Sequence, residues 1–233
     1  MYAVKNKRCI LLKSDSKEEK MNIKRNTRSL TFLGVLIAIE LVLTFAHIGF
    51  IPLPFMKATI LHIPVIIGAI FLGPIEGSIL GLVFGILSVV MNTIEPGVTS
   101  FVFSPFYTLG TTKGNVWSLV VALVPRVLVG ITSYYTYQFM SKFDKTKWSA
   151  YIGAGIVGSL TNTIFVMSFI YLFFGQAEPY ASNTAQGIGF VFKVIMGVVL
   201  TNGVPEAIVA AVLVSAIGKV LSKVFKTQRI LAR

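Results

Sequence analysis

The chain has 233 residues, of which 55% are hydrophobic and 13% charged, and its formal net charge is +12. Soluble domains carry about 25% charged residues, so this composition excludes a water-soluble globule and indicates an integral membrane protein. The charge is also concentrated, because 12 of the 30 charged side chains lie in Met1–Arg28. Membrane topology explains this basic excess better than nucleic-acid binding does.

Cysteine and histidine are too few for several classes of site. The single cysteine, Cys9, cannot form an internal disulfide, and the two histidines, His47 and His62, belong to no cluster with metal-ligand spacing. The chain also lacks a Walker A pattern, a nucleophile elbow and a His-Glu-x-x-His motif. We therefore expect no metal, no cofactor and no hydrolytic chemistry in this chain.

Six apolar segments separated by turn-forming residues predict a bundle of about six transmembrane helices, since a spanning helix needs about 20 mostly apolar residues. In chain order the segments are Leu30–Ala46, Thr59–Leu72, Glu76–Met91, Val116–Met140, Ala150–Phe174 and Phe190–Ile217. The second and third are short and meet at a tight Gly-Pro turn, which is typical of helices lined by protein rather than by lipid alone. The predicted fold class is an all-α integral membrane protein.

The basic residues are distributed unevenly between the two sides of this bundle, and the asymmetry predicts its orientation. One side carries 17 Lys and Arg residues, in the N-terminal tail, the loop around Lys145 and the C-terminal segment from Lys219 onward, against three on the other side. The positive-inside rule then places both the N- and C-termini in the cytoplasm. The predicted domains are a polar cytoplasmic tail at 1–28, a membrane domain at 29–219 and a basic cytoplasmic tail at 220–233.

The predicted external loops are much longer than the cytoplasmic turns. They span Ile48–Ala58, Asn92–Asn115 and Gly175–Gly189 and are rich in Pro, Gly, Ser, Thr and aromatic residues. Long ordered loops are usually lids or binding elements. The stretch Ser100–Tyr107 is too apolar for a free linker, so we expect it to fold back over the helix ends. This asymmetry favours a protein that captures a ligand from outside.

Arg126 is the most informative single residue, because it lies within the fourth predicted helix directly after Pro125. A charge inside the membrane is expensive and normally faces the bundle interior or a water-filled cavity. One interpretation is a structural ion pair with Glu40 or Glu206, the other charges within predicted helices. The other is a guanidinium that offers its fork of donors to a substrate carboxylate. The two interpretations are compatible.

Polar side chains at several other positions are candidate substrate ligands. Asn162 and Asn202 lie at comparable depth in the fifth and sixth segments, and buried amides must be hydrogen-bonded, either across helices or to a ligand. His62 and Asn92 fall near the outer ends of the second and third helices. Pro205 has no N–H, so the carbonyl of Thr201 is freed for another donor.

Two stripes of small residues indicate close helix packing. Gly77, Gly81 and Gly85 share one face of the third helix, where packing within the monomer is the favoured interpretation. Gly34 and Ala38 share a face of the first helix. For that pair, docking on a partner subunit and internal packing remain equal alternatives.

As a set, these patterns resemble the substrate-binding S components of energy-coupling factor (ECF) vitamin transporters of bacteria. The resemblance extends from about Ser29 to Lys219. It rests on the six helices, the stripe on the first helix, and the segments ILHIPVIIGAIFLGP (60–74), GLVFG (81–85), TSFVFSP (99–105) and TNGVPEA (201–207).

The resemblance implies a subunit of the plasma membrane that binds a vitamin outside and delivers it through a shared transmembrane T subunit and two cytoplasmic ATPases. ATP would then be used by the partner subunits alone. Gly34 and Ala38 match the small-residue docking stripe of the family, with Gly in place of the first Ala. The chain is most similar to pantothenate S components, in which case Arg126 would bind the carboxylate, and Asn162, Asn202 and Asn92 the hydroxyls and amide.

Other substrates and other classes of protein remain open at this point. Hydroxymethylpyrimidine is the second candidate substrate, and riboflavin and folate follow it. An integral membrane enzyme would have to use an Arg126–Glu206 pair, since no nucleophile–base set is visible. A structural or assembly protein would gain nothing from Arg126, Asn162 and Asn202 together at mid-depth.

Overall fold

The computed structural model describes residues 27–46, 50–52, 57–97, 99–109, 112–144, 146–174, 196–197 and 199–231. The chain divides into two compact units, residues 1–35 and 36–233. A first helix, Thr27–Phe45, runs from one unit into the other.

The second unit is built from helices, with two short hairpins at their ends. The long helices are α3 (Pro74–Ile94), α4 (Val116–Met140), α5 (Trp148–Phe174) and α7 (Val204–Leu231), and α2 (His62–Leu72) is shorter. A 3₁₀ turn, η1, covers Ser100–Val102, and a π-helical turn, η3, covers Val199–Gly203 directly before α7. The prediction of a helical bundle is confirmed.

The two antiparallel hairpins were not predicted. Strands β1 (Phe50–Pro52) and β2 (Lys57–Thr59) pair before α2, and β3 (Thr108–Leu109) and β4 (Thr112–Lys113) pair before α4. Both fall in segments that the sequence assigns to external loops, except that Thr59 was expected to open the second helix. Strands of two or three residues carry too few alternating side chains to give a period-2 signal.

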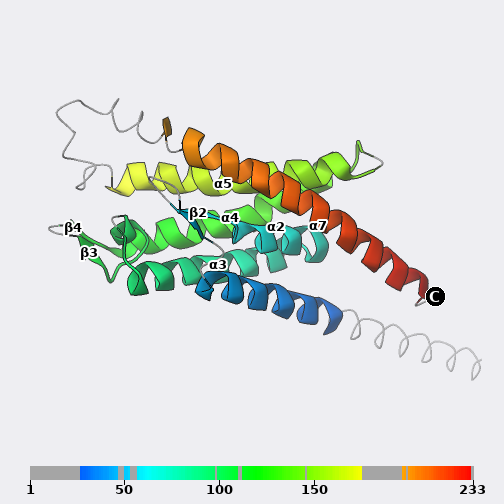
Figure 1. The fold of residues 1–233 in the computed structure, drawn as a ribbon, viewed down its shortest axis with the longest axis horizontal. Coiled ribbons are helices and arrows are strands. Elements are labelled where there is room, and N and C mark those ends of the chain that lie inside the picture. The colour runs from blue at the N-terminus through cyan, green and yellow to red at the C-terminus, as the bar shows by residue number, and fades with distance from the viewer. Residues whose placement is uncertain are drawn as a thin grey trace, which may run out of the picture. The chain divides into compact units, whose positions relative to one another are not determined.

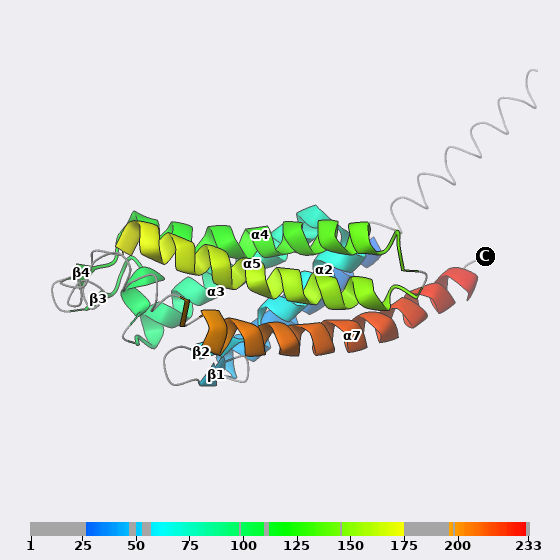
Figure 2. The ribbon, with the colours of Figure 1, turned by 90° about the horizontal axis from the view of Figure 1, so that it is seen from above.

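Helix α2 occupies the centre of this unit. It packs against α3, α4, α5 and α7, and Figures 1 and 2 show it among these longer helices. All eight residues from His62 to Ala69 are buried. This confirms the expectation that the short second segment is lined by protein.

Helix α3 is longer than the sequence predicted, with 21 residues instead of Glu76–Met91. Pro74 is part of the helix because the first turn needs no N–H from it, and Gly73 before it has φ +134°, a conformation that favours glycine. At the other end, the side chains of Asn92 and Thr93 donate to the backbone carbonyls of Ser88 and Val89, so these polar residues stay within the helix.

The sixth predicted helix, Phe190–Ile217, extends further at its C-terminal end than the sequence indicated. Residues 190–195 and 198 lie outside the described residues, residues 196–197 are helical, and the π-helical turn η3 directly precedes α7. Helix α7 then continues to Leu231, because no Gly or Pro interrupts the chain after Gly218. The predicted C-terminal tail at 220–233 is thus largely helical.

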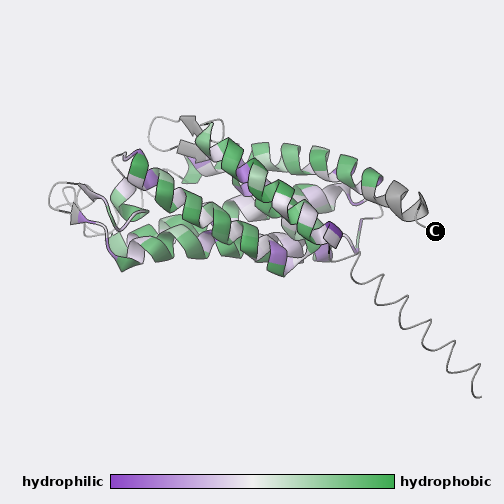
Figure 3. Cartoon of the chain, turned by 90° about the horizontal axis from the view of Figure 1, so that it is seen from below, coloured by the Kyte–Doolittle hydropathy of each residue, from purple (hydrophilic) through white to green (hydrophobic). Residues whose placement is uncertain are grey.

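Five helices in the described part of the chain are long and apolar enough to cross a membrane: Thr27–Phe45, α3, α4, α5 and the segment Val199–Val224. Large apolar side chains are exposed along them, including Ile86, Val124, Leu172, Ile208 and Val212. Figure 3 shows that hydrophobic residues make up most of these long helices. With the short α2, the described residues form six helices, as predicted.

Glycines allow the closest helix contacts, and they confirm internal packing for the stripe on α3. A Cβ at Gly77 would lie 2.5 Å from the Cβ of Ala69 on α2. A Cβ at Gly85 would lie 2.9 Å from the carbonyl oxygen of Ala122, and one at Gly81 would overlap the carbonyl oxygen of Arg126. The α3 and α4 backbones therefore touch beside Arg126.

Candidate substrate-binding site

The backbone around Pro125 positions the guanidinium group of Arg126. Proline has no N–H, so the carbonyl of Val121, four residues earlier on α4, lacks its usual helical donor. Nη1 of Arg126 donates to this oxygen at 2.7 Å. The side chain is only 6% exposed, and its Nε has no hydrogen-bond partner among the described residues. One edge of the guanidinium is therefore fixed and another remains available.

Two phenylalanines flank the same guanidinium. Its carbon atom lies 5.5 Å from the ring centroid of Phe84 on α3 and 5.2 Å from that of Phe103, directly after η1. Cation–π contacts at this distance contribute about 0.5–2 kcal/mol, the upper value where the pair is shielded from water. These contacts hold the positive charge in an apolar setting without neutralising it.

Glu206 and His62 form the acidic side of the site. Oε1 of Glu206, in the first turn of α7, lies 3.2 Å from Nδ1 of His62 at the start of α2, and the side chains are 9% and 1% exposed. Neither atom has hydrogen-bond geometry in this contact. Glu206 also interacts electrostatically with Arg126. The 3.2 Å contact of Glu206 is thus with His62, whereas an ion pair with Arg126 was one of the two alternatives that the sequence left open.

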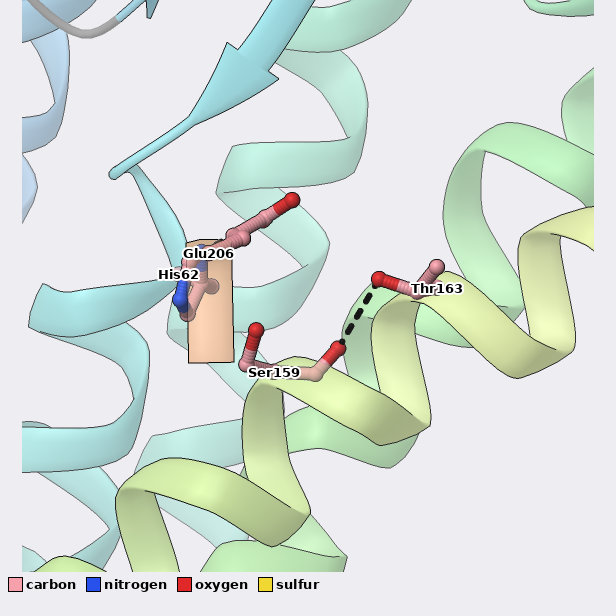
Figure 4. A network of polar contacts seen from close by, with 4 residues as sticks. All are labelled: His62, Ser159, Thr163 and Glu206. Atoms are coloured by element: carbon pink, nitrogen blue, oxygen red, sulfur yellow. Dashed lines mark hydrogen bonds and ion pairs between the residues drawn. The ribbon is translucent and has the colours of Figure 1, made fainter. Parts of the chain in front are cut away.

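Helix α5 contributes small polar side chains beside this pair. In Figure 4 the hydroxyl of Ser159 points toward His62 and Glu206, and Thr163 donates from Oγ1 to the carbonyl oxygen of Ser159 at 3.3 Å. Ser159 and Asn162 are three residues apart and share a helix face. Ser133 of α4 lies at the α4–α5 interface, because a Cβ added at Gly158 of α5 would overlap its hydroxyl.

Buried polar atoms without a partner among the described residues gather on the helices that surround α2. They are His62 Nδ1 and Nε2, Arg126 Nε, Ser133 Oγ, Ser159 Oγ, Asn162 Oδ1, Asn202 Nδ2 and Glu206 Oε1. Most buried polar groups in proteins are hydrogen-bonded, and each that is not costs about 1–3 kcal/mol. These donors and acceptors, all on mutually packed elements, have the chemistry required to bind a polar organic ligand.

Asn162 and Asn202 are both buried, as the sequence predicted for interior amides. Asn202 lies in the π-helical turn η3, and Gly203 beside it comes within 3.0 Å of Thr163 on α5 when a Cβ is added. Turns of this kind often mark functional sites, because they widen the helix and redirect side chains.

Asn92 has a different setting from the other predicted ligands. Its Nδ2 donates to Ser88, and its Oδ1 accepts a hydrogen bond of 2.8 Å from Ser100 Oγ. In this structure Asn92 therefore ties η1 to α3. Any role in contacting substrate remains a hypothesis.

The loop around Phe101, which the sequence assigns to the outside, folds back over the helix ends, as expected from its apolar sequence. Phe101, Val102 and Phe103 are buried against α4 and α5, in a cluster with Val121 and Ile170. Ser118 donates to the carbonyl oxygen of Phe101 at 2.8 Å, and the hydroxyls of Thr93 and Ser104 are 2.7 Å apart. The loop thereby brings Phe103 against Arg126.

Glu40 does not form the ion pair that the sequence suggested as one alternative. The residue is fully buried on the first helix, and neither carboxylate oxygen has a hydrogen-bond partner among the described residues. Composition identified Glu40 as a charge within a helix, but the partner of such a charge depends on helix packing, which the sequence does not specify.

The two residues predicted to dock a partner subunit lie on the first helix. Ala38 is exposed, as are Ile39, Val42 and Phe45 near it, whereas Leu36, Glu40 and Thr44 form the buried face. Gly34 lies one turn earlier and belongs to the first unit. The exposed position of Ala38 is compatible with an external contact.

Ser133 and Ser159 were not predicted from the sequence as site residues, and Glu206 was predicted only as an ion-pair partner. Their signal is weak, since single serines are common in membrane helices. The spacing of Ser159 from Asn162 and the neighbouring small residue Gly158 could have marked that face as polar and closely packed. Within the described residues, no group of three or more His, Cys, Asp or Glu could hold a metal ion.

Comparison with known proteins identifies this arrangement of helices and polar groups. Residues 28–218 match the family described as "ECF transporter, substrate-specific component". The chain is also 38% identical over 196 residues to a protein of Lactococcus lactis subsp. cremoris (strain MG1363) named "Pantothenic acid transporter PanT", with 82% of this chain and 90% of that protein covered. This chain therefore belongs to the family of substrate-specific components of ECF transporters and is a multi-pass protein of the bacterial membrane.

Proposed function

We propose that this substrate-specific component binds pantothenate. The observation that carries the proposal is the buried Arg126, whose Nε is available among partnerless polar groups of α2, α4, α5, η3 and α7. The Lactococcus relative named a pantothenic acid transporter supports the same substrate.

The chemistry of pantothenate suits these groups. Its carboxylate would accept hydrogen bonds from the Arg126 guanidinium, because charge-assisted bonds of this kind are about twice as strong as neutral ones. Its amide and two hydroxyls need both donors and acceptors, which Asn162, Asn202, Ser133 and Ser159 offer. A flat aromatic vitamin without a carboxylate would leave the Arg126 charge unmatched.

We further propose that the loaded subunit assembles with a transmembrane T subunit and two cytoplasmic ATPases, which would supply the energy for uptake. In this arrangement both termini lie in the cytoplasm, as the excess of Lys and Arg on that side favours. Substrate would enter from the side of the external loop 99–109. The exposed Ala38 on the first helix is the proposed contact with the T subunit.

Thermal unfolding and isothermal titration calorimetry of the purified chain test the substrate. Pantothenate, hydroxymethylpyrimidine, riboflavin and folate are compared, and a ligand at 100 times its Kd should add about 2.7 kcal/mol of stability. We expect stabilisation by pantothenate and none by pantothenol, in which an alcohol replaces the carboxylate. A shift with another vitamin alone would contradict the substrate but not the family.

Arg126→Ala, with Lys113→Ala as an exposed basic control, tests the role assigned to the guanidinium. We expect Arg126→Ala to abolish pantothenate binding in a monodisperse, folded protein and Lys113→Ala to leave it unchanged. Arg126→Lys should bind weakly, because an ammonium keeps the charge but lacks the planar fork. Full affinity in Arg126→Ala would refute this assignment.

Co-purification with the T subunit and ATPases tests the docking contact. Ala38→Leu should lose the complex and vitamin uptake while keeping pantothenate binding, and Gly34→Leu is expected to do the same. Ala216→Leu, which makes the same change at an exposed alanine of α7, is the matched control. Loss of pantothenate binding in Ala38→Leu would show instead that this position packs internally.

A further inference from the structure

The bundle buries few charged side chains, so a substrate that brings another charge meets no spare counter-charge. On the elements that pack against α2, these groups are Arg126 on α4 and Glu206 on α7. Helix α5 carries no Asp, Glu, Lys or Arg, and α3 carries only Glu76, in its first turn. Glu40 is buried on the first helix, whose Leu36 approaches Gly68 of α2.

When Glu206 is ionised in the empty site, its charge balances that of Arg126. Their charges interact, although Arg126 donates to the Val121 carbonyl and Glu206 is in contact with His62. An arriving carboxylate that binds Arg126 brings a second negative charge to the same buried cation. One positive group then faces two negative ones, and an uncompensated charge in a low-dielectric interior is strongly unfavourable.

The His62–Glu206 contact can absorb this excess. Nδ1 and Oε1 are 3.2 Å apart, and this contact lacks hydrogen-bond geometry. A proton taken up from solvent by this pair would restore the balance. For groups this close, the proton belongs to the pair rather than to either residue.

We propose that binding of a carboxylate vitamin at Arg126 is coupled to the uptake of one proton by the His62–Glu206 pair. This inference rests on the proposed function, because it requires an anionic substrate at Arg126. The protonated pair favours the bound state, so affinity falls as the pH rises. On the alkaline side of the titration, Kd increases up to tenfold per pH unit.

Calorimetry in buffers with different ionisation enthalpies counts the protons taken up per ligand bound. For the unmodified chain between pH 6 and 9, where pantothenate stays ionised, we expect uptake that approaches one proton on the alkaline side. Pantothenol brings no charge, so whatever binding it retains should take up none. Pantothenate binding with no proton uptake and a Kd independent of pH would overturn the inference.

Glu206→Gln and Glu40→Gln form a matched pair of variants. The amide at 206 removes the negative charge that the carboxylate substrate would face, so Glu206→Gln should bind pantothenate with no proton uptake and little pH dependence. Glu40→Gln makes the same chemical change at the other buried carboxylate and should keep the uptake of the unmodified chain. Undiminished uptake in Glu206→Gln would contradict the assignment.

These results separate the two proposals. If the unmodified chain fails to bind pantothenate at any pH, the proposed substrate is wrong. If it binds without protons, the substrate stands and the coupling fails. Because the unmodified chain is itself informative, the test does not depend on whether Glu206→Gln folds.

Discussion

Nη1 of Arg126 donates a 2.7 Å hydrogen bond to the carbonyl oxygen of Val121, five residues earlier on the same helix. This contact exists because Pro125 cannot donate to that oxygen. The adjacent Pro-Arg dipeptide thus both frees an acceptor and supplies the charged side chain that occupies it. A local feature of the sequence thereby sets the direction of the group proposed to bind substrate.

Pro125→Ala should weaken this arrangement. The new N–H at position 125 would compete for the Val121 carbonyl, so the Arg126 guanidinium would be held less firmly. We expect pantothenate affinity to fall about 3- to 10-fold, consistent with the loss of one hydrogen bond of about 0.5–1.5 kcal/mol. Calorimetry measures the change.

Thermal unfolding of the same variant supplies the control. Alanine is about 3 kcal/mol more favourable than proline in a helix interior, so the protein should unfold no earlier than the unmodified chain. If Pro125→Ala both unfolds earlier and binds pantothenate weakly, the weaker binding is explained by impaired folding and not by the position of Arg126.

Gly81→Ala should disturb the site from the opposite helix. Its Cβ would overlap the carbonyl oxygen of Arg126, and that backbone atom cannot rotate away. Overpacking of this kind costs about 1–3 kcal/mol, so we expect a lower Tm and weaker pantothenate binding. At Gly97 the nearest atom to an added Cβ is 3.9 Å away, so Gly97→Ala should change neither quantity.

Ser100→Ala should loosen the external loop. The Ser100 hydroxyl donates to Asn92 Oδ1 and accepts from the N–H of Gly97, both at 2.8 Å. Without it, the segment that holds Phe103 against Arg126 loses an attachment to α3, and bound pantothenate should dissociate about 2- to 10-fold faster.

Stopped-flow displacement of bound vitamin measures this rate. Ser141→Ala, which removes a hydroxyl bonded to Gln138 after α4, is the control and should leave dissociation unchanged. An unaltered rate in Ser100→Ala would mean that other contacts hold the loop.

Asp144 stabilises the turn between α4 and α5, outside the membrane-spanning segments. Hydrogen bonds from the side chains of Thr146 and Ser149, and from their N–H groups, hold the pKa of its carboxyl well below the usual range. A lowered pKa in the folded state stabilises the fold above the unfolded-state pKa of about 3.9, and this contribution is lost as the pH falls toward the folded-state pKa.

Asp144→Asn should therefore lower the Tm at pH 7. The difference between the variant and the unmodified chain should shrink progressively below about pH 4, as Asp144 becomes protonated on unfolding. Thermal unfolding at pH 7, 4 and 3 checks this, and a difference that stays constant with pH would refute the role of the carboxylate charge.

The sequence by itself determined the class of protein, the helices and the interior polar residues. Long apolar segments, the basic excess between them and the few polar residues within them can all be read along the chain. They determine the class because a membrane-spanning protein needs such segments and such a charge distribution. Pro125-Arg126 is also local, since the missing N–H and the charged side chain are neighbours. Asn162, Asn202 and the apolar loop after Ser100 were predicted to be buried for the same reason.

Only the tertiary structure decided which polar groups meet. His62 and Glu206 are 144 positions apart in the chain, yet their side chains lie 3.2 Å from each other, while Glu40 has no ionic partner in the described part of the chain. Asn92 supports a loop through Ser100, although its position resembles that of a ligand residue. Pairings of this kind depend on helix rotation and on glycine contacts such as Gly81 against Arg126, which hydropathy and spacing do not encode.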